Sequence, residues 1–291
     1  MGEVFALGCA VFWAFAVILL KRSGETVSPV ALNLFRVTFS LPLLLATALI
    51  VRGPDLPPVP PRDYLVLVAS GILGIVIADT LFHKSLNMVG AGVTAIIDTF
   101  YSPITVLLAF LMLNERIGLR DLVGMCMIMG AVLVSATLTP PPDRSRKHLV
   151  EGVAIGILGL CFLALGIVVA KPVLARWPVL WVATVRQAGS AAVLLAFAIA
   201  SPRRREYLGA LRPRHVWRRM VPATVLGSYL SLMLWIGGMK YTLASIAAIL
   251  NQSSTVFILI LSVILLHERL TKRKIAATLL ALAGVLLVSL H

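Results

Sequence analysis

One apolar segment occurs twice in this chain, and the repeat constrains the fold more than any other feature. Residues 95–116 read AIIDTFYSPITVLLAFLMLNER, and residues 248–269 read AILNQSSTVFILILSVILLHER. The two copies are 153 residues apart and align without a gap. Similarity at a fixed spacing indicates that one structural unit has been duplicated.

The repeat extends upstream of this segment with a slightly shorter spacing. Lys21 matches Lys171, and Arg36 matches Arg186, at a spacing of 150 residues. The difference of three residues falls in loops, where insertions are tolerated. The chain therefore divides into a first repeat at 1–138, a linker at 139–149 and a second repeat at 150–291.

The apolar content of the chain predicts a membrane protein. Hydrophobic residues make up 59% of the 291 residues and charged residues only 13%, whereas a soluble domain needs more polar surface. A spanning helix needs about 20 mostly apolar residues. The sequence lacks the short segments of alternating polarity that a membrane β-barrel requires. Ten spans are expected, near residues 3–20, 30–51, 64–83, 91–112, 119–138, 150–170, 178–200, 219–239, 244–266 and 273–290.

The number of spans in each repeat sets the relation between the halves. Because five is odd, the second copy starts on the opposite side of the membrane from the first. The predicted fold is an all-α membrane protein whose ten transmembrane helices form two inverted five-helix repeats. In secondary transporters of this architecture, the binding site lies between the repeats near the membrane midplane.

The net charge of +14 is interpreted as a signal for membrane orientation rather than for nucleic-acid binding, because the basic residues lie in short loops beside the spans. Loops after odd-numbered spans hold 17 lysines and arginines, and loops after even-numbered spans hold 7. The positive-inside rule then places the odd-numbered loops in the cytoplasm and both termini outside.

Motifs that carry enzyme chemistry are incomplete or missing. Residues 267–271 begin an HExxH zinc pattern, but Thr271 stands where the second histidine is needed. The sequence contains neither a Walker A motif nor a GxSxG elbow. Cys9, Cys126 and Cys161 lie in apolar segments at no metal spacing, so each is expected to pack among hydrophobic side chains. We therefore expect no enzyme activity, no cofactor and no metal site.

Four charged residues lie deep within the predicted spans, away from the span ends, where ionisable groups are costly and mark functional sites by default. They are Arg36, Asp79, Asp98 and Arg186. The two arginines occupy matched repeat positions. They either serve as structural anchors and ion-pair partners, or contact a substrate. An arginine at this depth can also reach the lipid headgroups.

Asp79 and His83 are four residues apart and share one face of a helix. Two interpretations stand side by side. The pair could handle protons, because histidine titrates near neutral pH. Alternatively, it marks a capped helix end at the membrane surface, with Lys84 in water.

Asp98 lies deeper, and its repeat match is Asn251, which is followed by Gln252. A polar cluster at this depth predicts a cavity lining, because unpaired polar groups in hydrocarbon are costly. Tyr101 lies one turn beyond Asp98 on the same face. We expect Asp98 to bind a proton or a substrate ammonium, with the two amides completing the polar lining.

Three other groups of residues near this segment allow weaker interpretations. Tyr229 and Trp235 are assigned to the pocket wall, with an interfacial aromatic belt as the alternative, which is favoured for Tyr241. Pro103 frees a backbone carbonyl that faces either a cavity or a neighbouring helix. The Glu-Arg pairs at 115–116 and 268–269 are expected to hold loop geometry rather than to contact substrate.

The sequence resembles the EamA-type members of the drug/metabolite transporter superfamily over essentially its whole length. The resemblance is strongest between Gly74 and Gly130, where ADTLFHKSL precedes Pro103 and LNERI, and the second half adds LNQSSTVFILIL and LLHERL. Val256 stands where the first copy has the proline, and Arg36 matches an arginine common in the family. The resemblance implies a ten-helix carrier of a kind that mostly exports metabolites, amino acids or drugs. The family is often drawn with both termini in the cytoplasm, opposite to what the charge count predicts.

The repeat and the resemblance together predict a secondary-active transporter that exports small polar metabolites, amino-acid-like or drug-like, by alternating access. The alternatives are an importer or exchanger of metabolites, or a non-transporting membrane enzyme or lipid-handling protein. The expected partners are a small-molecule substrate, membrane lipid and, as one option, a coupling proton, but no nucleic acid. We expect a monomer or homodimer in the bacterial cytoplasmic (inner) membrane.

Overall fold

The computed structural model describes residues 1–24, 26–52, 59–135, 146–212, 215–257, 261 and 272–289. All regular secondary structure in these ranges is helical, which confirms the all-α expectation. Most of the predicted linker, residues 262–266 of the ninth predicted span and the whole 267–271 pattern lie outside the described residues.

Helices of the first half follow the apolar segments closely, and two of them begin at a proline. Proline favours the first helical turn because its φ is already helical and its missing N–H is not needed there. The elements are α1 (Gly2–Gly24), α2 (Pro29–Arg52), α3 (Pro61–Gly71), the π-helix η1 (Ile72–Ile77), α4 (Ala78–Asp98), α5 (Tyr101–Leu113) and α6 (Leu119–Ser135).

Helices of the second half are interrupted at comparable places. The elements are α7 (Arg146–Arg176), α8 (Val179–Ala200), α9 (Arg204–Gly209), α10 (Trp217–Thr224), the π-helix η2 (Val225–Ser231), α11 (Leu232–Tyr241), α12 (Ala244–Asn251) and α14 (Lys272–Ser289). The last turns of α7 pass beyond Pro172 and are held at Asp63 of α3, which accepts hydrogen bonds from Arg176 Nη2 at 3.0 Å and Trp177 Nε1 at 2.7 Å.

In the part of the chain that the structure describes, six helical stretches are long and apolar enough to cross a membrane. They are Gly2–Leu20, Pro29–Val51, Pro61–Val89, Lys147–Arg176, Val179–Ala200 and Trp217–Tyr241. These stretches match the first three and the sixth to eighth predicted spans. Two shorter apolar helices, Tyr101–Leu113 and Leu279–Val288, fall in two further predicted spans, and the total of ten stays a prediction.

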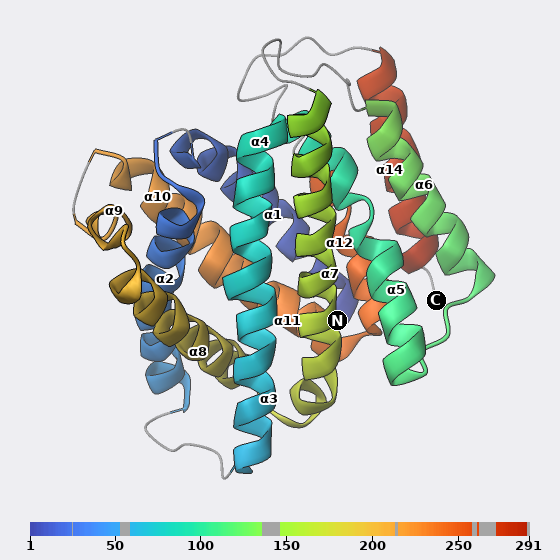
Figure 1. Cartoon of the computed structure of the whole chain (residues 1–291). Coiled ribbons are helices and arrows are strands. Elements are labelled where there is room, and N and C mark those ends of the chain that lie inside the picture. Colours follow the sequence, from blue (N-terminus) through green and yellow to red (C-terminus); the bar gives the residue numbers. More distant parts are fainter. Residues whose placement is uncertain are drawn as a thin grey trace.

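The predicted boundary between the spans at 64–83 and 91–112 lies where the chain turns back on itself. Helical backbone extends from Pro61 through η1 to Asp98, but a side-chain carbon added at Gly156 of α7 would lie 2.7 Å from Ser85 Oγ and 3.0 Å from Ile97 Cγ2, so the chain reverses direction between Ser85 and Ile97. The chain rises through α3 and α4 and descends again into α5 (Figure 1).

The segment at 201–219, between the seventh and eighth predicted spans, also contains helix, namely α9 and the start of α10. Tyr207 of α9 is buried, and its ring lies 6.3 Å from that of Phe197 on α8. Trp217 of α10 lies edge-on to Phe35 of α2, with ring centroids 5.2 Å apart. These aromatic anchors hold the short helices on the bundle. The surrounding arginines make the segment polar, so its composition alone does not predict these two helices.

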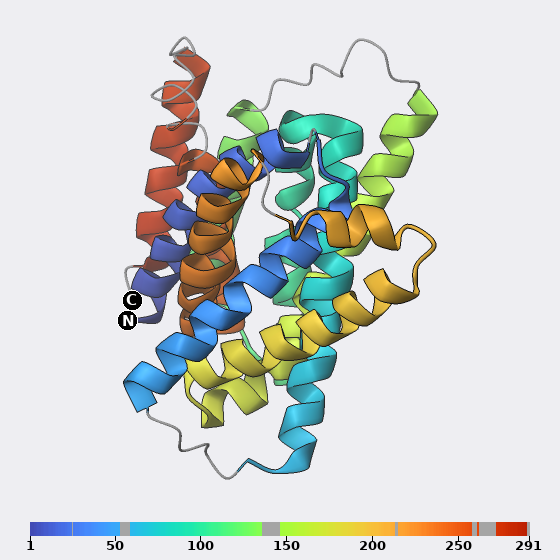
Figure 2. The same ribbon diagram turned by 90° about the vertical axis from the view of Figure 1, so that its left-hand side faces the viewer.

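The two halves pack against each other along their whole length. In the first half α1 packs on α11 and η2, and α4 with η1 packs on α7; α2 meets α8, α5 meets α12, and α6 meets α14. Thus α2 and α6 pack against their own copies, α8 and α14, whereas α1 and its copy α7 exchange partners between the repeats. Matched helices also run in opposite directions, as α1 rising and α7 descending make plain (Figure 1). The start of α1 and the end of α14 lie on the same side of the molecule (Figure 2).

The two π-helices occupy matched positions of the repeat. Residue 72 at the start of η1 and residue 225 at the start of η2 are 153 residues apart. The wide π turn is rare and is frequently found at functional sites. Its recurrence shows that both copies of the unit keep the same irregular turn in the middle of a long apolar helix.

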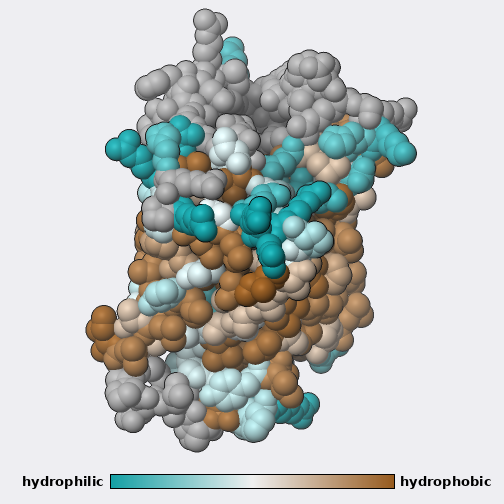
Figure 3. All heavy atoms as spheres, turned by 60° about the vertical axis from the view of Figure 1, so that its left-hand side comes forward, coloured by the Kyte–Doolittle hydropathy of each residue, from teal (hydrophilic) through white to brown (hydrophobic). Residues whose placement is uncertain are grey.

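The surface of the molecule carries a broad hydrophobic band. Figure 3 shows this band across the middle of one face, with hydrophilic residues above and below it. Large apolar side chains such as Leu107, Leu158 and Phe197 are exposed around the bundle. Cys126 and Cys161 are exposed as well, so the expectation that all three cysteines pack internally is wrong for these two. The band is the surface expected of a protein that faces lipid.

Candidate functional site

A cavity of about 150 Å³ lies between the two halves. Its wall is formed by α1, α2, α4, α7, α8, α11, α12 and both π-helices, with Tyr101 from α5. Gly74 of η1 and Gly227 of η2 face this space, and the missing side chains help to keep it open. The cavity thus sits where the irregular turns of the two repeats meet.

Most of the residues predicted for the site line this cavity. The lining includes Arg36, Asp79, Asp98, Tyr101, Arg186, Trp235, Asn251 and Gln252. His83 and Tyr229 were predicted with them, but neither belongs to the cavity wall. The fold therefore brings together residues from both halves, such as Arg36 and Gln252, that are more than two hundred positions apart in the sequence.

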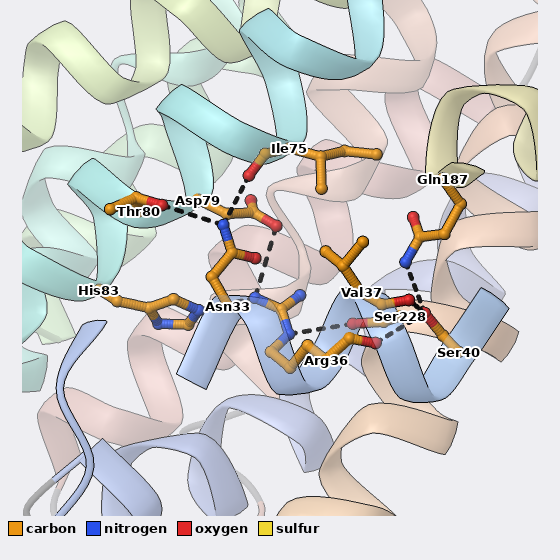
Figure 4. A network of polar contacts seen from close by, with 10 residues as sticks. All are labelled: Asn33, Arg36, Val37, Ser40, Ile75, Asp79, Thr80, His83, Gln187 and Ser228. Atoms are coloured by element: carbon orange, nitrogen blue, oxygen red, sulfur yellow. Dashed lines mark hydrogen bonds and ion pairs between the residues drawn. The ribbon is translucent and has the colours of Figure 1, made fainter. Parts of the chain in front are cut away.

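Arg36 is neutralised within the protein. Its Nη1 lies 3.4 Å from Asp79 Oδ2 and 2.7 Å from His83 Nε2, and its Nε donates to Ser228 Oγ at 2.9 Å (Figure 4). The Trp13 ring lies 5.8 Å from the guanidinium carbon. The side chain is only 4% exposed, so these contacts replace water around a buried charge.

Asp79 and His83 meet through Arg36 rather than as an isolated pair. Because a guanidinium can only donate, His83 Nε2 accepts, and the imidazole is neutral with its proton on Nδ1. α4 continues for fifteen residues beyond His83, so the alternative of a helix end at this position is wrong. His83 is buried beside the Phe82 ring, at 5.6 Å.

Other buried polar side chains form hydrogen bonds to the helices that carry Arg36 and Asp79. Asn33 Nδ2 donates to the carbonyl of Ile75 in η1 at 2.8 Å and to Thr80 Oγ1 at 3.0 Å (Figure 4). Ser40 Oγ donates to the main-chain oxygen of Arg36 at 2.7 Å. Asn33 thereby ties the π turn to α2, which fixes the distance between the helix that carries Arg36 and the helix that carries Asp79.

Arg186, the repeat match of Arg36, has different surroundings. Its side chain is fully buried, Nη1 donates to Ser70 Oγ, and the Trp235 ring lies 5.7 Å from its guanidinium carbon. Nε and Nη2 have no hydrogen-bond partner among the described residues. No described carboxylate lies within ion-pairing distance either. The two matched arginines are therefore neutralised to different degrees.

Asp98 and Asn251 mark matched breaks in two helices. α4 ends at Asp98 and α12 ends at Asn251, 153 residues later, and each is followed by a two-residue turn. Gln252 Nε2 donates to the main-chain oxygen of Asp98 and so bridges the two breaks. The Asp98 carboxylate, which lines the cavity, has no partner among the described residues. Broken helices at a repeat interface are a common setting for substrate and ion sites.

Aromatic side chains complete the wall. Tyr101 is 5% exposed, and its hydroxyl has no hydrogen-bond partner in the described structure. Trp235 covers the guanidinium of Arg186. The Tyr229 hydroxyl, in contrast, lies 2.6 Å from Thr47 Oγ1 of α2. Its neighbours Gly227 and Ser228 line the cavity instead. Tyr229 does not line this cavity, and its role as a substrate contact stays a prediction.

Several lining residues were missed by sequence reasoning. Trp13, Phe82 and Cys9 sit in continuous apolar runs, where periodicity does not separate a cavity face from a packed face. Gln187 and Ser228 gave a usable signal, because each is a polar residue within a span. Gln187 also directly follows the conspicuous Arg186.

The fold and the cavity define the class: a helical membrane protein that encloses a cavity with charged residues between two similar halves. The profile described as EamA-like transporter family matches the chain twice, at residues 1–137 and 150–290. The chain belongs to this family, which is part of the drug/metabolite transporter superfamily, and it is an integral membrane protein with transporter relatives.

Comparison with solved structures agrees on the fold. A structure described only as "Crystal structure of protein" aligns with a TM-score of 0.80 at 17% sequence identity, covering 99% of this chain and 96% of the other. At this sequence identity, the match supports the similarity of the fold and nothing further. No curated protein matches the chain.

Proposed function

We propose that this protein is a secondary-active carrier that exports small polar metabolites, amino-acid-like or drug-like, by alternating access. The observation that carries the proposal is the cavity at the meeting point of the two matched helix breaks, after Asp98 and after Asn251. Charged groups in a membrane interior are costly and are kept where they bind a solute or an ion.

Alternating access follows from the relation between the halves. The opposite directions of α1 and α7, and the exchange of packing partners between the repeats, support two inverted five-helix units. Two units of the same internal structure can rock about a central site and expose it to either side in turn. A ten-helix bundle in the bacterial cytoplasmic membrane is part of this proposal, as is the cytoplasmic position of the odd-numbered loops.

Proton coupling is assigned to Asp98. Its carboxylate lines the cavity without a protein partner, whereas Asp79 is paired with Arg36 at 3.4 Å. A free carboxylate can exchange a proton or an ammonium with the cavity, but a paired one must first lose its arginine. His83, with its Nε2 bonded to Arg36, acts as part of the arginine's support.

The test is solute flux in proteoliposomes with a pair of matched variants on α7. Leu163 lines the cavity, and Leu158 is 49% exposed on the outer surface. Leu163→Trp fills the cavity and should reduce exchange of a labelled amino-acid mixture by about tenfold or more, a loss of about 1.4 kcal/mol or more. Leu158→Trp should leave it unchanged. Equal flux in both variants would favour a non-transporting membrane enzyme or lipid-handling protein, and so would the absence of flux of any solute under any ion gradient. Net flux inward would favour an importer.

A further inference from the structure

The positions around the two matched arginines differ in one charge. Asp79 and His83, which contact Arg36 in the first half, correspond to Leu232 and Ile236 in the second. The second half therefore offers Arg186 no carboxylate and no imidazole at the places where Arg36 finds them. Both halves therefore carry the arginine, but only the first half carries the aspartate that balances its charge.

The free groups of Arg186 form one edge of its guanidinium. Nη1 is bonded to Ser70, and Nε and Nη2 remain without a partner among the described residues. Nε–H and one N–H of Nη2 point in parallel and match the two oxygens of a carboxylate. Trp235 lies against the guanidinium at 5.7 Å and fixes its plane.

The space beside this edge is kept open by a glycine. A side-chain carbon added at Gly74 would lie 3.3 Å from Arg186 Nη2, and Gly74 itself lines the cavity. Tyr101, whose hydroxyl is also unpartnered, lines the same cavity. The edge therefore lies beside a glycine, has a second donor in the same cavity, and has no carboxylate of the described residues within ion-pairing distance.

We infer that Arg186 is the anchor for a carboxylate group of the substrate, bound side-on through Nε and Nη2, while Arg36 is a structural cation. The inference rests on the proposed function and narrows it to substrates that carry a carboxylate. A buried charge without a counter-charge is costly, and a carboxylate ligand would remove that cost on binding. Amides and esters of the same size lack the charge and should bind poorly.

Binding is measured on purified protein in detergent, as the rise in thermal stability with four probes: butyrate and L-leucine, and their uncharged-end counterparts butyramide and L-leucinamide. The two carboxylates should stabilise the wild type, and the two amides should need about tenfold to a hundredfold higher concentrations, the ratio expected for a lost charge-assisted hydrogen bond. Arg186→Gln should abolish this preference, and Arg186→Lys should restore part of it. Arg203→Gln, at an exposed arginine, is the control and should retain the preference.

A second variant covers the case in which Arg186→Gln fails to fold. Gly74→Ala keeps every charge but crowds Nη2, so it should weaken carboxylate binding several-fold while leaving amide binding unchanged. The inference is overturned if the amides bind wild-type protein as well as the carboxylates do, if no probe binds, or if both variants keep the wild-type preference. Carboxylate preference without flux in liposomes would sustain this inference and sink the proposed function; flux without carboxylate preference would do the reverse.

Discussion

Glu115 of the first half caps a helix of the second half at Ser245. Glu115 Oε2 accepts from the backbone N–H of Ser245 at 3.1 Å and from its hydroxyl at 2.9 Å, and Oε1 accepts from the N–H of Ala244 at 3.1 Å. Lys171 Nζ lies 3.6 Å from the same carboxylate. The carboxylate thus satisfies the free N–H groups at the start of α12, where negative charge is also favoured by the helix dipole.

Local sequence explains how Glu115 reaches this position. Asn114 ends α5 in the left-handed conformation, with φ of 54°, and the N–H of Glu115 returns to the carbonyl of Ala109 at 3.2 Å. Asparagine tolerates this conformation better than most residues. From the sequence, we expect the Glu-Arg pair at 115–116 to hold loop geometry. In the structure, the glutamate of this pair joins the two repeats.

Glu115→Ala should therefore lower the thermal stability of the purified protein. Loss of charge-assisted hydrogen bonds to a helix start costs about 1.5–3 kcal/mol. Thermal unfolding in detergent should show a midpoint several degrees lower than for wild type. Glu151→Gln, at an exposed position of α7, is the control. Identical midpoints for Glu115→Ala and the control would contradict the capping role.

Arg36→Leu should impair folding more than any specific step of transport, because it leaves Asp79 and His83 buried without their cation. Breaking a buried ion pair from one side costs about 3–5 kcal/mol. The yield of monodisperse protein should fall sharply in Arg36→Leu and recover in part when Asp79→Leu is added. A double variant that is no better than the single one would show that the pair does not act as a unit.

Asp98→Asn should separate exchange from accumulation. The amide imitates a permanently protonated carboxyl, so the variant should fold and exchange solute across liposomes at a rate near that of wild type. It should lose accumulation driven by a pH gradient, because no proton is released on either side. Unchanged gradient-driven accumulation would remove Asp98 from the coupling step and direct attention to Asp79.

The charge distribution predicts that both chain ends lie outside. A reporter active only in the cytoplasm, fused after His291, should give no signal, and the same reporter inserted in the linker at 139–149 should give a strong one. This pair of fusions decides between the charge count and the usual drawing of the family. Strong signal from the fusion after His291 would invert the proposed orientation.

Much of the candidate site could be predicted from the sequence because polar residues stand out in apolar spans. Asp98 and Asn251 were located from the repeat alone, and both line the cavity. Arg36 and Arg186 could also be located, but not told apart. The difference between them depends on Asp79, whose partner only tertiary structure reveals.

Other features lay beyond sequence reasoning for physical reasons. A π turn has no residue signature, so neither η2 nor the resulting direction of Tyr229 toward Thr47 could be foreseen. Trp13 and Phe82 look the same as core residues in an apolar run.

The central claim is that one cavity opens alternately to both sides, and Cys9 can report it directly. Cys9 lines the cavity, is buried, and lies 3.2 Å from Ser231 Oγ, whereas Cys126 and Cys161 are exposed and can be replaced by serine. The measurement is the labelling of Cys9 by a membrane-impermeant methanethiosulfonate, in right-side-out and in inside-out vesicles. Alternating access predicts labelling from both sides. Labelling from one side only, or from neither, would contradict it.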